Sequence, residues 1–326
     1  MAPGQASPAR AVFMGTPDFA AVILDHLLTQ PSPIVVAAVV TQPDRPAGRG
    51  RRLTPPPVKT VALAAGIPVI QPASVRRPRF VARLRQLAPD IVVLAAYGKI
   101  LPAEVLAVPP RGSLNVHASL LPRHRGAAPV ASAIRHGDTT TGVSIMLMDE
   151  GMDTGPVLAA APEPIRPDDT TETLTARLAV QGGGLLTSTI PLWLAGTLTP
   201  QAQDDGDATY CRPLRRSDGL LHWEHDADGL ARQVRAVNPW PGAYTYWDRQ
   251  LLKVWRAQAV PAPAGAPPGL EPGRVVPYDR GVAVICGEGV LLLDEVQLAG
   301  RRRMAGAEFG RGQRRFPGSQ LTAGTR

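Results

Sequence analysis

Seven consecutive apolar residues, Ile34–Val40, constrain the fold of this chain more than any other feature of its sequence. The run is rich in valine and isoleucine, which favour strands, and it is far shorter than the roughly 20 apolar residues of a membrane-spanning helix. An uninterrupted apolar strand is buried on both of its faces, and such strands belong to parallel sheets that helices cover on each side. The run therefore predicts an α/β fold.

Strand-like and helix-like segments alternate around this run, from Arg10 to about Gly196. We expect a helix to begin after Gly15, with Thr16 as its N-cap and Pro17 as its first residue, followed by Asp18 in the first turn. The alternation predicts a doubly wound, mostly parallel sheet. Further strands are expected at Ala11–Met14, Ile67–Ile70, Ile91–Ala95, Ser113–Val116 and Val143–Met148, and further helices at Arg79–Leu87, Ala127–His136 and Thr171–Ala195.

The first strand-to-helix turn argues against a nucleotide cofactor. Dinucleotide-binding folds place G-x-G-x-x-G there, so that the backbone approaches a pyrophosphate closely. This chain has Gly15-Thr16-Pro17-Asp18 instead, so NAD and FAD are disfavoured. The sequence also has neither a P-loop nor an H-E-x-x-H motif.

The pattern changes after a polar segment, Gly196–Arg212, which we interpret as a linker without strands. Short strands separated by glycine-containing turns follow it, and they predict a small antiparallel β-barrel, similar to an OB fold. The expected strands are Ala243–Trp247, Leu251–Arg256, Arg274–Tyr278, Val282–Cys286 and Val290–Gln297. We therefore expect a disordered extension at 1–9, an α/β domain at 10–196, a linker at 197–212 and a basic β-barrel at 213–326.

Positive charge is clustered rather than spread along the chain. Lys and Arg number 35 against 27 Asp and Glu, giving a net charge of +8. Seven arginines and one acid lie between Val296 and Arg326, and four arginines and one lysine lie within Gln42–Lys59 against Asp44 alone. A basic surface that serves solubility would explain the total, but clustering favours a partner rich in phosphate, nucleic acid first.

Two cysteines, Cys211 and Cys286, are too few for a disulfide framework or a cysteine zinc site, which fits a reducing compartment. The first ten residues have no apolar core typical of a secretion signal, and no stretch of the chain is long and apolar enough to span a membrane. We expect a cytoplasmic protein with no membrane association.

Two polar clusters follow predicted strands. In the first, Asn115 and His117 are two residues apart on one strand, so both side chains point to the same face at the strand's carboxyl end. Open α/β sheets bind ligands there. Taken alone, an N-x-H pair more often satisfies local backbone groups.

The second cluster, Met148–Gly155, offers Asp149, Glu150 and Asp153 as candidate carboxylates at the end of another strand. An ordinary turn rich in aspartate and glycine would explain it equally well when taken alone.

Together the clusters resemble the folate-dependent formyltransferase family. The resemblance rests on Asn115, His117, Ser119-Leu120-Leu121-Pro122, Arg125-Gly126 and Met148…Asp153-Thr154-Gly155, and it extends from about Arg10 to Phe316. The strings FMGTPDFA, TQPDRPAGRGRRLTPPPVK, SLLPRHRGAAP and NPWPGA, with KVW at Lys253–Trp255, are similar to the branch that formylates aminoacyl-tRNA. The resemblance implies transfer of the formyl group of 10-formyltetrahydrofolate to the methionyl amino group of initiator tRNA. This reaction requires no metal, and we expect a monomer.

The same resemblance implies roles for individual residues. Asn115, His117 and Asp153 would be the catalytic set, within a domain that binds formyl-folate. Ser119, Leu120, Leu121 and Pro122 would contribute to the folate site, and we expect Tyr97 and Gly98 to form its opposite wall. The tRNA would contact two groups of arginines: Arg45, Arg49, Arg51 and Arg52 in a loop, and Arg301, Arg302 and Arg303 in the barrel.

Two alternatives stay open at this point. A formyltransferase acting on a sugar or another small amine would share the catalytic set but would have no use for a basic C-terminal module. A catalytically inactive RNA-binding protein on the same fold would have no need of an intact Asn115, His117 and Asp153.

Overall fold

The computed structural model describes residues 7–47, 50, 52–262, 271–279 and 281–324, in two compact units. The first unit comprises residues up to 129 together with 140–164 and 175–211, and the second comprises 130–139, 165–174 and 212 onwards. Most of the predicted extension at 1–9 lies outside the described residues, and the first strand begins at Ala9.

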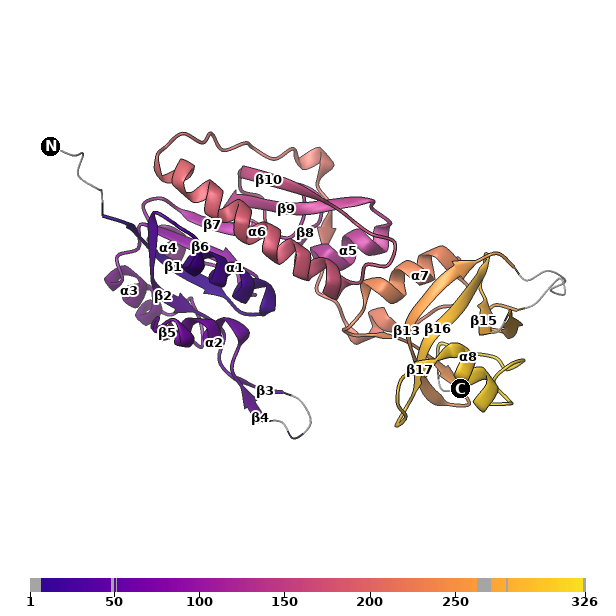
Figure 1. The fold of residues 1–326 in the computed structure, drawn as a ribbon. Coiled ribbons are helices and arrows are strands. Elements are labelled where there is room, and N and C mark those ends of the chain that lie inside the picture. Colours follow the sequence, from indigo (N-terminus) through magenta and orange to yellow (C-terminus); the bar gives the residue numbers. More distant parts are fainter. Residues whose placement is uncertain (1–6, 48–49, 51, 263–270, 280, 325–326) are drawn as a thin grey trace. The chain divides into compact units, whose positions relative to one another are not determined.

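A seven-stranded sheet forms the centre of the first unit (Figure 1), in the order β10-β9-β7-β6-β1-β2-β5. Its strands are β1 (Ala9–Gly15), β2 (Ile34–Val40), β5 (Val69–Ile70), β6 (Ile91–Ala95), β7 (Ser113–His117), β9 (Thr140–Leu147) and β10 (Val157–Pro164). The pairs from β5 to β7 are parallel, whereas β9 runs antiparallel to both β7 and β10. This confirms the predicted α/β class with a mostly parallel sheet.

Helices cover both faces of this sheet. On one face, α3 (Pro78–Gln86) and α4 (Ala103–Leu106) join a buried apolar cluster that includes Val92 and Leu94 of β6. On the other face, α6 (Thr171–Leu194) crosses β7, where a Cβ added to Gly182 would lie 2.9 Å from Cγ1 of Val116. Glycine is needed at this crossing because the helix backbone approaches the strand so closely.

The first helix, α1 (Asp18–Thr29), corrects the predicted N-cap. Its N-cap is Pro17, not Thr16, and no side chain caps it. The hydroxyl of Thr16 instead donates to the backbone oxygen of Tyr97, 3.2 Å away, at the end of the neighbouring strand β6. The Thr16 hydroxyl therefore bonds to a residue distant in sequence instead of capping the helix that follows it. Two other helices of the chain are α2 (Pro57–Ala64) and α5 (Pro129–His136).

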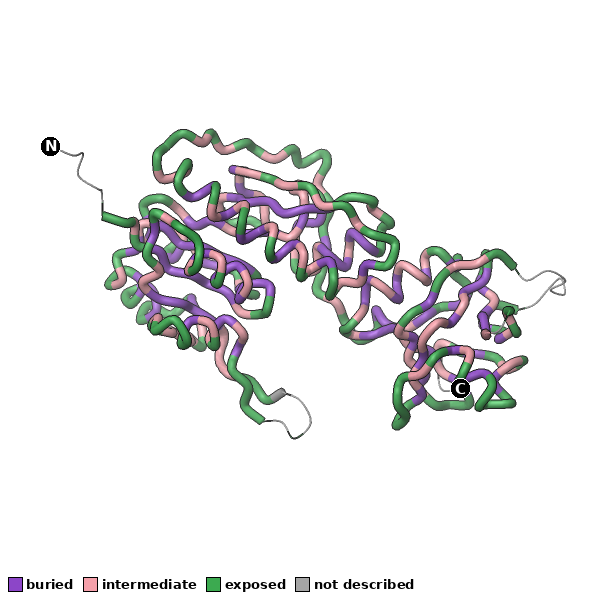
Figure 2. Tube along the Cα trace, viewed as in Figure 1, coloured by how far each residue is buried: buried purple, intermediate pink, exposed green. Residues whose placement is uncertain are grey.

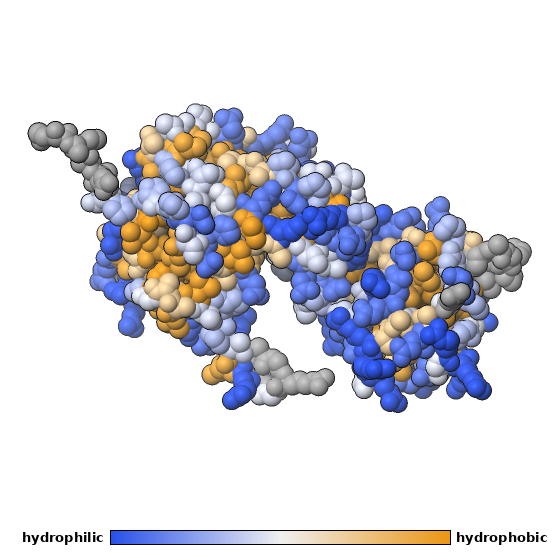
Figure 3. Space-filling view, in the orientation of Figure 1, coloured by the Kyte–Doolittle hydropathy of each residue, from blue (hydrophilic) through white to orange (hydrophobic). Residues whose placement is uncertain are grey.

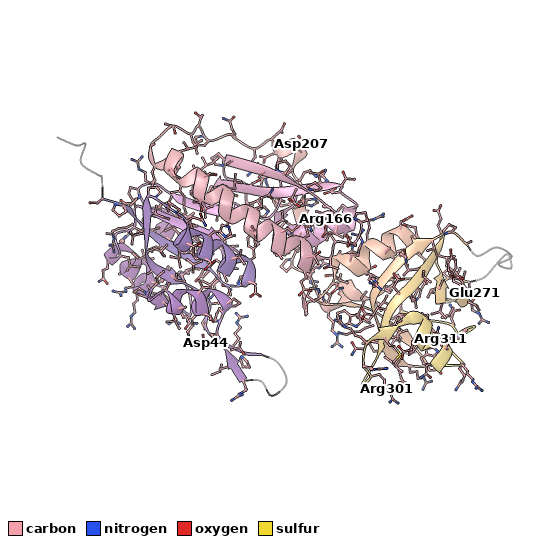
Figure 4. All side chains as sticks on the ribbon, in the orientation of Figure 1. Asp44, Arg166, Asp207, Glu271, Arg301 and Arg311 are labelled. Atoms are coloured by element: carbon pink, nitrogen blue, oxygen red, sulfur yellow. The ribbon has the colours of Figure 1, made fainter. Side chains whose placement is uncertain are left out.

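The segment interpreted as a linker contains a short strand, so its prediction as strandless was wrong. A 3-10 turn, η1 (Asp205–Asp207), precedes β11 (Tyr210–Cys211), and Figure 4 labels Asp207 in this turn. Strand β11 pairs in parallel with β8 (Arg125–Gly126), because the turn after β7 presents backbone groups that need partners. The segment therefore packs against the turn that follows β7 rather than crossing solvent.

The second unit contains an antiparallel sheet in the order β12-β13-β16-β15-β14, with β17 paired to β16. Residues 318–322 hydrogen-bond both to Tyr246 of edge strand β12 and to Val275 of edge strand β14, so both edges of the sheet are covered as in a barrel. Its elements are η2 (Arg216–Gly219), α7 (Ala227–Ala236), β12 (Ala243–Trp247), β13 (Gln250–Val260), β14 (Val275–Tyr278), β15 (Gly281–Ile285), β16 (Val290–Leu298), β17 (Met304–Ala305) and α8 (Gly306–Gly312).

Each unit has its own core. In the second unit, Trp247, Phe309 and Phe316 pack edge to face at centroid distances of 4.8–5.7 Å, within a cluster of buried apolar residues. Figure 2 shows buried residues concentrated along the strands of both sheets. None of the helices within the described residues is both long and apolar enough to cross a membrane.

Candidate active site

Strand β7 places Asn115 and His117 on the face of the sheet opposite α6. Val116 points toward α6, so the residues on either side of it point the other way. In the register of the sheet, Asn115 pairs with Leu94 of β6 and His117 pairs with Ser144 of β9. The two predicted catalytic side chains therefore share a face, at the carboxyl end of a central strand.

The imidazole of His117 is buried and has a different neighbour at each nitrogen. Its Nε2 lies 3.0 Å from the backbone oxygen of His124, and its Nδ1 lies 3.7 Å from Oδ2 of Asp153. A carbonyl oxygen only accepts hydrogen bonds, so Nε2 must be the protonated nitrogen. This leaves Nδ1 as the ring nitrogen that can take up or release a proton, facing a carboxylate.

The loop after β9 distinguishes the three candidate carboxylates. Asp153 faces His117, and its Oδ2 also accepts from the backbone N–H of Gly126 at 2.8 Å. Asp149 instead accepts from the Thr154 hydroxyl at 2.8 Å and from a backbone N–H, so it closes its own turn, while Glu150 is exposed. The structure therefore joins Asp153, and neither of the other two, to His117.

Asn115 is half-buried, and within the described part of the chain its side-chain amide makes no hydrogen bond. Its neighbours across the sheet, Leu94 and Met146, are apolar. An amide held on a strand between apolar side chains has its N–H groups free to donate to a ligand.

The Ser119–Pro122 segment forms a tight turn over the end of β7. The Ser119 hydroxyl donates to the backbone oxygen of Arg123 at 2.6 Å, and Ser144 bridges the turn by donating to Ser119 O and accepting from Leu121 N. Leu120 packs against Gly142 of β9. Because the Ser119 hydroxyl donates within the turn, its contribution to a ligand site would come through the turn's shape.

On the neighbouring strand end, Tyr97 and Gly98 differ sharply in exposure. The Tyr97 ring is buried in the apolar cluster beneath α3 and α4, its hydroxyl has no partner in the described structure, and burial raises its pKa to about 12. Gly98 is exposed with a φ of 76°, which leaves its backbone open to a ligand. Gln42 donates from Nε2 to Tyr97 O at 3.0 Å.

Two residues that received no role in the sequence analysis contact this site. Arg125 is only 1% exposed, and its Nε donates to Oε1 of Gln203 at 3.0 Å. Gln203 in turn donates from Nε2 to the backbone oxygens of Asp153 and Gly155, at 2.9 and 2.6 Å. Arg125 belongs to the Arg125-Gly126 motif on which the family resemblance rests. The sequence around Gln203 is polar, and nothing in it indicates that this segment contacts the site.

The described residues contain no group of three or more His, Cys, Asp or Glu side chains placed to hold a metal ion. Cys211 is buried, and this burial raises its thiol pKa, which keeps the thiol neutral and poorly nucleophilic.

A two-stranded hairpin, β3 (Arg45–Ala47) and β4 (Arg52–Thr54), contains the predicted basic loop. Lys59 forms an ion pair with Asp44 at 2.8 Å at the base of the hairpin, where Figure 4 labels Asp44. Arg45 donates to Oε1 of Gln42 at 2.7 Å, and Arg52 is exposed. Arg49 and Arg51, which were assigned to tRNA binding, lie outside the described residues.

The arginines predicted in the second unit are all exposed at the turn after β16. Arg303 stacks on the Trp255 ring, with its guanidinium carbon 3.3 Å from the ring centroid, and Arg302 forms an ion pair with Glu308 at 3.2 Å. Figure 3 shows strongly hydrophilic residues over this part of the unit, where Figure 4 labels Arg301 and Arg311. Within the described residues, neither Arg301 nor Arg303 forms an ion pair.

Comparison with known proteins gives a consistent result over nearly the whole chain. Residues 9–190 match the formyl transferase family model, and residues 213–314 match the model of the formyl transferase C-terminal domain. The methionyl-tRNA formyltransferase of Symbiobacterium thermophilum is 51% identical over 302 residues, which cover 92% of this chain and 91% of that protein. This chain belongs to the methionyl-tRNA formyltransferase family.

Two further comparisons agree with this membership. The methionyl-tRNA formyltransferase of Geobacter sulfurreducens is 45% identical over 313 residues, covering 96% of both chains. Among solved structures, an N-formyltransferase from Helicobacter canadensis in complex with folinic acid and dTDP-3-aminofucose shares the fold, with a TM-score of 0.64 at 16% identity. That match covers 87% of this chain and 98% of the other.

Proposed function

We propose that this protein transfers the formyl group of 10-formyltetrahydrofolate to the methionyl amino group of initiator tRNA, giving N-formylmethionyl-tRNA. The observation that supports the chemistry best is the pairing of His117 Nδ1 with Asp153 Oδ2, 3.7 Å apart, beside the free amide of Asn115. Family membership supports the choice of acceptor and donor.

Formyl transfer forms a bond from the acceptor nitrogen to the formyl carbon and breaks the bond from that carbon to the folate nitrogen. Asn115 donates an N–H to the formyl oxygen, on which negative charge develops. Preorganised donors of this kind contribute about 3–4 kcal/mol to catalysis. The acceptor's α-amino group titrates near pH 7.7–8.0 in its ordinary state, so a useful neutral fraction exists at pH 7 without a strong base.

His117 moves the protons that this reaction requires. Its Nδ1 accepts a proton as the acceptor nitrogen attacks, and it returns a proton to the side of the folate nitrogen, which must be protonated to leave. Asp153 stabilises the imidazolium form of His117 in between. No covalent enzyme intermediate is needed.

The co-substrate site would lie between the Ser119–Pro122 turn and the Tyr97–Gly98 strand end. A pterin ring needs an apolar slot with backbone hydrogen-bonding groups. Leu121 and Pro122 are half-buried, and the Gly98 backbone is exposed, which suits both needs. The donor's chemical form, 10-formyltetrahydrofolate, is part of the proposal.

The tRNA would contact both basic regions. We assign the acceptor end to the β3–β4 hairpin, with Arg45, Arg49, Arg51 and Arg52, and the tRNA backbone to Arg301, Arg302 and Arg303. Guanidinium groups suit this because they bind phosphate bidentately and stack on unpaired bases. We also propose that the protein acts as a monomer. Its two free cysteines suit the reducing cytoplasm, where we propose that it works.

The test is formylation of charged initiator tRNA with 10-formyltetrahydrofolate, compared in parallel with free methionine and with amino sugars. We expect product from the charged tRNA and a far lower kcat/KM with either small amine. Turnover of a small amine at a comparable kcat/KM would reject the proposed acceptor.

A further inference from the structure

The carboxylate of Asp153 projects from a backbone in the left-handed conformation, which costs free energy even for aspartate, one of the non-glycine residues that adopt it most often. Asp153 has a φ of 54°, in the left-handed region, where residues other than glycine occur infrequently. Such a conformation persists only when surrounding contacts hold it. The residues that hold Asp153 therefore decide where its carboxylate lies relative to His117.

The amide of Gln203 makes those contacts. Its Nε2 donates to the backbone oxygen of Asp153 at 2.9 Å and to that of Gly155 at 2.6 Å, so it spans the turn on both sides of Thr154. Both bonds are made to backbone atoms of the turn, and they use both N–H groups of the amide.

The opposite end of the same amide is fixed by a buried cation. Oε1 of Gln203 accepts from Nε of Arg125 at 3.0 Å, and Arg125 is 1% exposed. Arg125 also donates to the Tyr210 hydroxyl at 2.9 Å and forms an ion pair with Asp205 at 2.8 Å. Because the guanidinium can only donate, it fixes which end of the Gln203 amide points at Asp153.

The two sides of this arrangement are also joined through the backbone. The turn that follows Arg125 donates from Gly126 N to Asp153 Oδ2 at 2.8 Å, and the carbonyl just before Arg125, that of His124, accepts from His117. Strand β11 pairs with this same turn. One buried arginine therefore connects the groups that orient the imidazole with those that orient the carboxylate.

We propose that Gln203 is a positioning residue for the reaction: its amide holds the Asp153 carboxylate opposite His117, and Arg125 sets the orientation of that amide. This rests on the proposed function, in which Asp153 stabilises the protonated His117. Gln203 makes no hydrogen bond to the His117 ring or to the Asp153 carboxylate, so its proposed effect is on where the backbone of Asp153 places that carboxylate.

Two substitutions at Gln203 separate positioning from simple packing. Gln203→Glu keeps an oxygen for Arg125, so the buried cation stays paired, but it replaces the N–H donors with a carboxylate oxygen facing two carbonyl oxygens. Gln203→Met removes both interactions at similar volume. The matched control is Gln201→Met, because Gln201 is exposed in the same segment and its amide donates only to Thr199 O.

We expect Gln203→Glu and Gln203→Met to lower kcat roughly 10- to 100-fold, the effect of misplacing a reacting group by about 1 Å. KM for tRNA and for folate should change little, and Gln201→Met should match the wild type. Gln203→Glu should lower the melting temperature less than Gln203→Met does, because it keeps the pairing with Arg125. A normal kcat in Gln203→Glu would overturn the proposal, because it would show that only the pairing with Arg125 matters.

A double-mutant cycle with Asp153→Asn completes the test, since asparagine tolerates the left-handed conformation. If Gln203 acts through Asp153, Gln203→Glu should slow the Asp153→Asn enzyme no further. Multiplicative losses would overturn the proposal while leaving the function intact. An Asp153→Asn variant as fast as the wild type would instead reject the catalytic role of Asp153, and the positioning role with it.

Discussion

The Nε2 atom of His117 lies 3.0 Å from the backbone oxygen of His124, seven residues further along the chain. This contact fixes the tautomer, because the carbonyl can only accept, and it turns Nδ1 toward Asp153. The proton that matters for transfer is therefore the one on Nδ1. His117 ends strand β7 and Asp153 lies in the loop after β9, and their relationship leads to the first prediction.

His117→Gln should separate the structural role of Nε2 from the proton-transfer role proposed for Nδ1. A glutamine amide can replace the Nε2 donor to His124 O, but it offers nothing that titrates at the position of Nδ1. We expect a melting temperature close to that of the wild type and a kcat lowered about 100-fold or more, with tRNA binding little changed. His117→Ala should lose both stability and turnover. A His117→Gln enzyme with near-normal kcat would show that Nδ1 does not take part in proton transfer.

Asn115→Ala should also lower kcat about 100-fold or more, because it removes the N–H donor to the formyl oxygen.

Replacing Arg301, Arg302 and Arg303 with glutamine should weaken tRNA binding and flatten its salt dependence. Every arginine–phosphate ion pair that these substitutions remove should lower the slope of log K against log salt concentration by about 0.7–0.9. Folate affinity should not change. The control removes the same charge from exposed arginines of the first unit, Arg76, Arg77 and Arg79, and should leave the slope unaltered. Equal slopes for the wild type and the triple variant would show that these arginines are solvated and do not contact the tRNA phosphates.

Arg49→Leu should strongly depress kcat/KM on initiator tRNA and leave folate binding intact. Arg49→Lys should lose much of the activity too, because an ammonium group cannot reproduce the planar guanidinium fork. The measurement compares both variants on initiator tRNA and on a tRNA with a paired first base pair, with Arg79→Leu as the control. Equal losses on the two tRNAs would mean that Arg49 attracts tRNA electrostatically without recognising the unpaired end. No loss on either tRNA would show that Arg49 does not contribute to formylation.

Asp218→Asn should destabilise the second unit in a pH-dependent way. Hydrogen bonding and charge from Arg212 lower the pKa of Asp218 below its ordinary 3.8. A lowered folded-state pKa means that the contribution is complete above about pH 4 and is lost as the pH falls through the folded value. We expect a loss of about 1–3 kcal/mol at pH 7, measured by denaturant unfolding, that shrinks toward pH 2. An equal loss at both pH values would contradict the linkage, and the exposed Asp228→Asn serves as the reference.

The sequence predicts the central sheet well because its strands are continuous apolar runs. Ile34–Val40 and Ile91–Ala95 match β2 and β6 residue for residue. Burial on both faces leaves such segments no alternative structure, so local pattern and final fold agree. The same holds for Asn115 and His117, whose common face follows from strand periodicity alone.

The contacts among loops are not predictable in this way. Gln203 lies in a polar segment whose composition is that of a linker, yet the structure brings it onto the backbone of Asp153, 50 residues earlier. The Thr16 hydroxyl bonds to Tyr97 O rather than capping its own helix. In each case a partner distant in sequence replaces the local one, and a single sequence contains no signal for that pairing.

The amide of Gln42 has a thermodynamic consequence. It accepts from Arg45 at the base of the hairpin with one atom and donates to the backbone of Tyr97, beside Gly98, with the other. A ligand that draws Arg45 away from this amide alters the hydrogen bond from Gln42 to Tyr97, which follows β6. A ligand bound beside Tyr97 in turn alters the hydrogen bond from Arg45 to Gln42. Linkage requires the two effects to be equal in free energy. If binding of one substrate changes the affinity for the other through Gln42, the second substrate changes the affinity for the first by the same factor, whichever binds first.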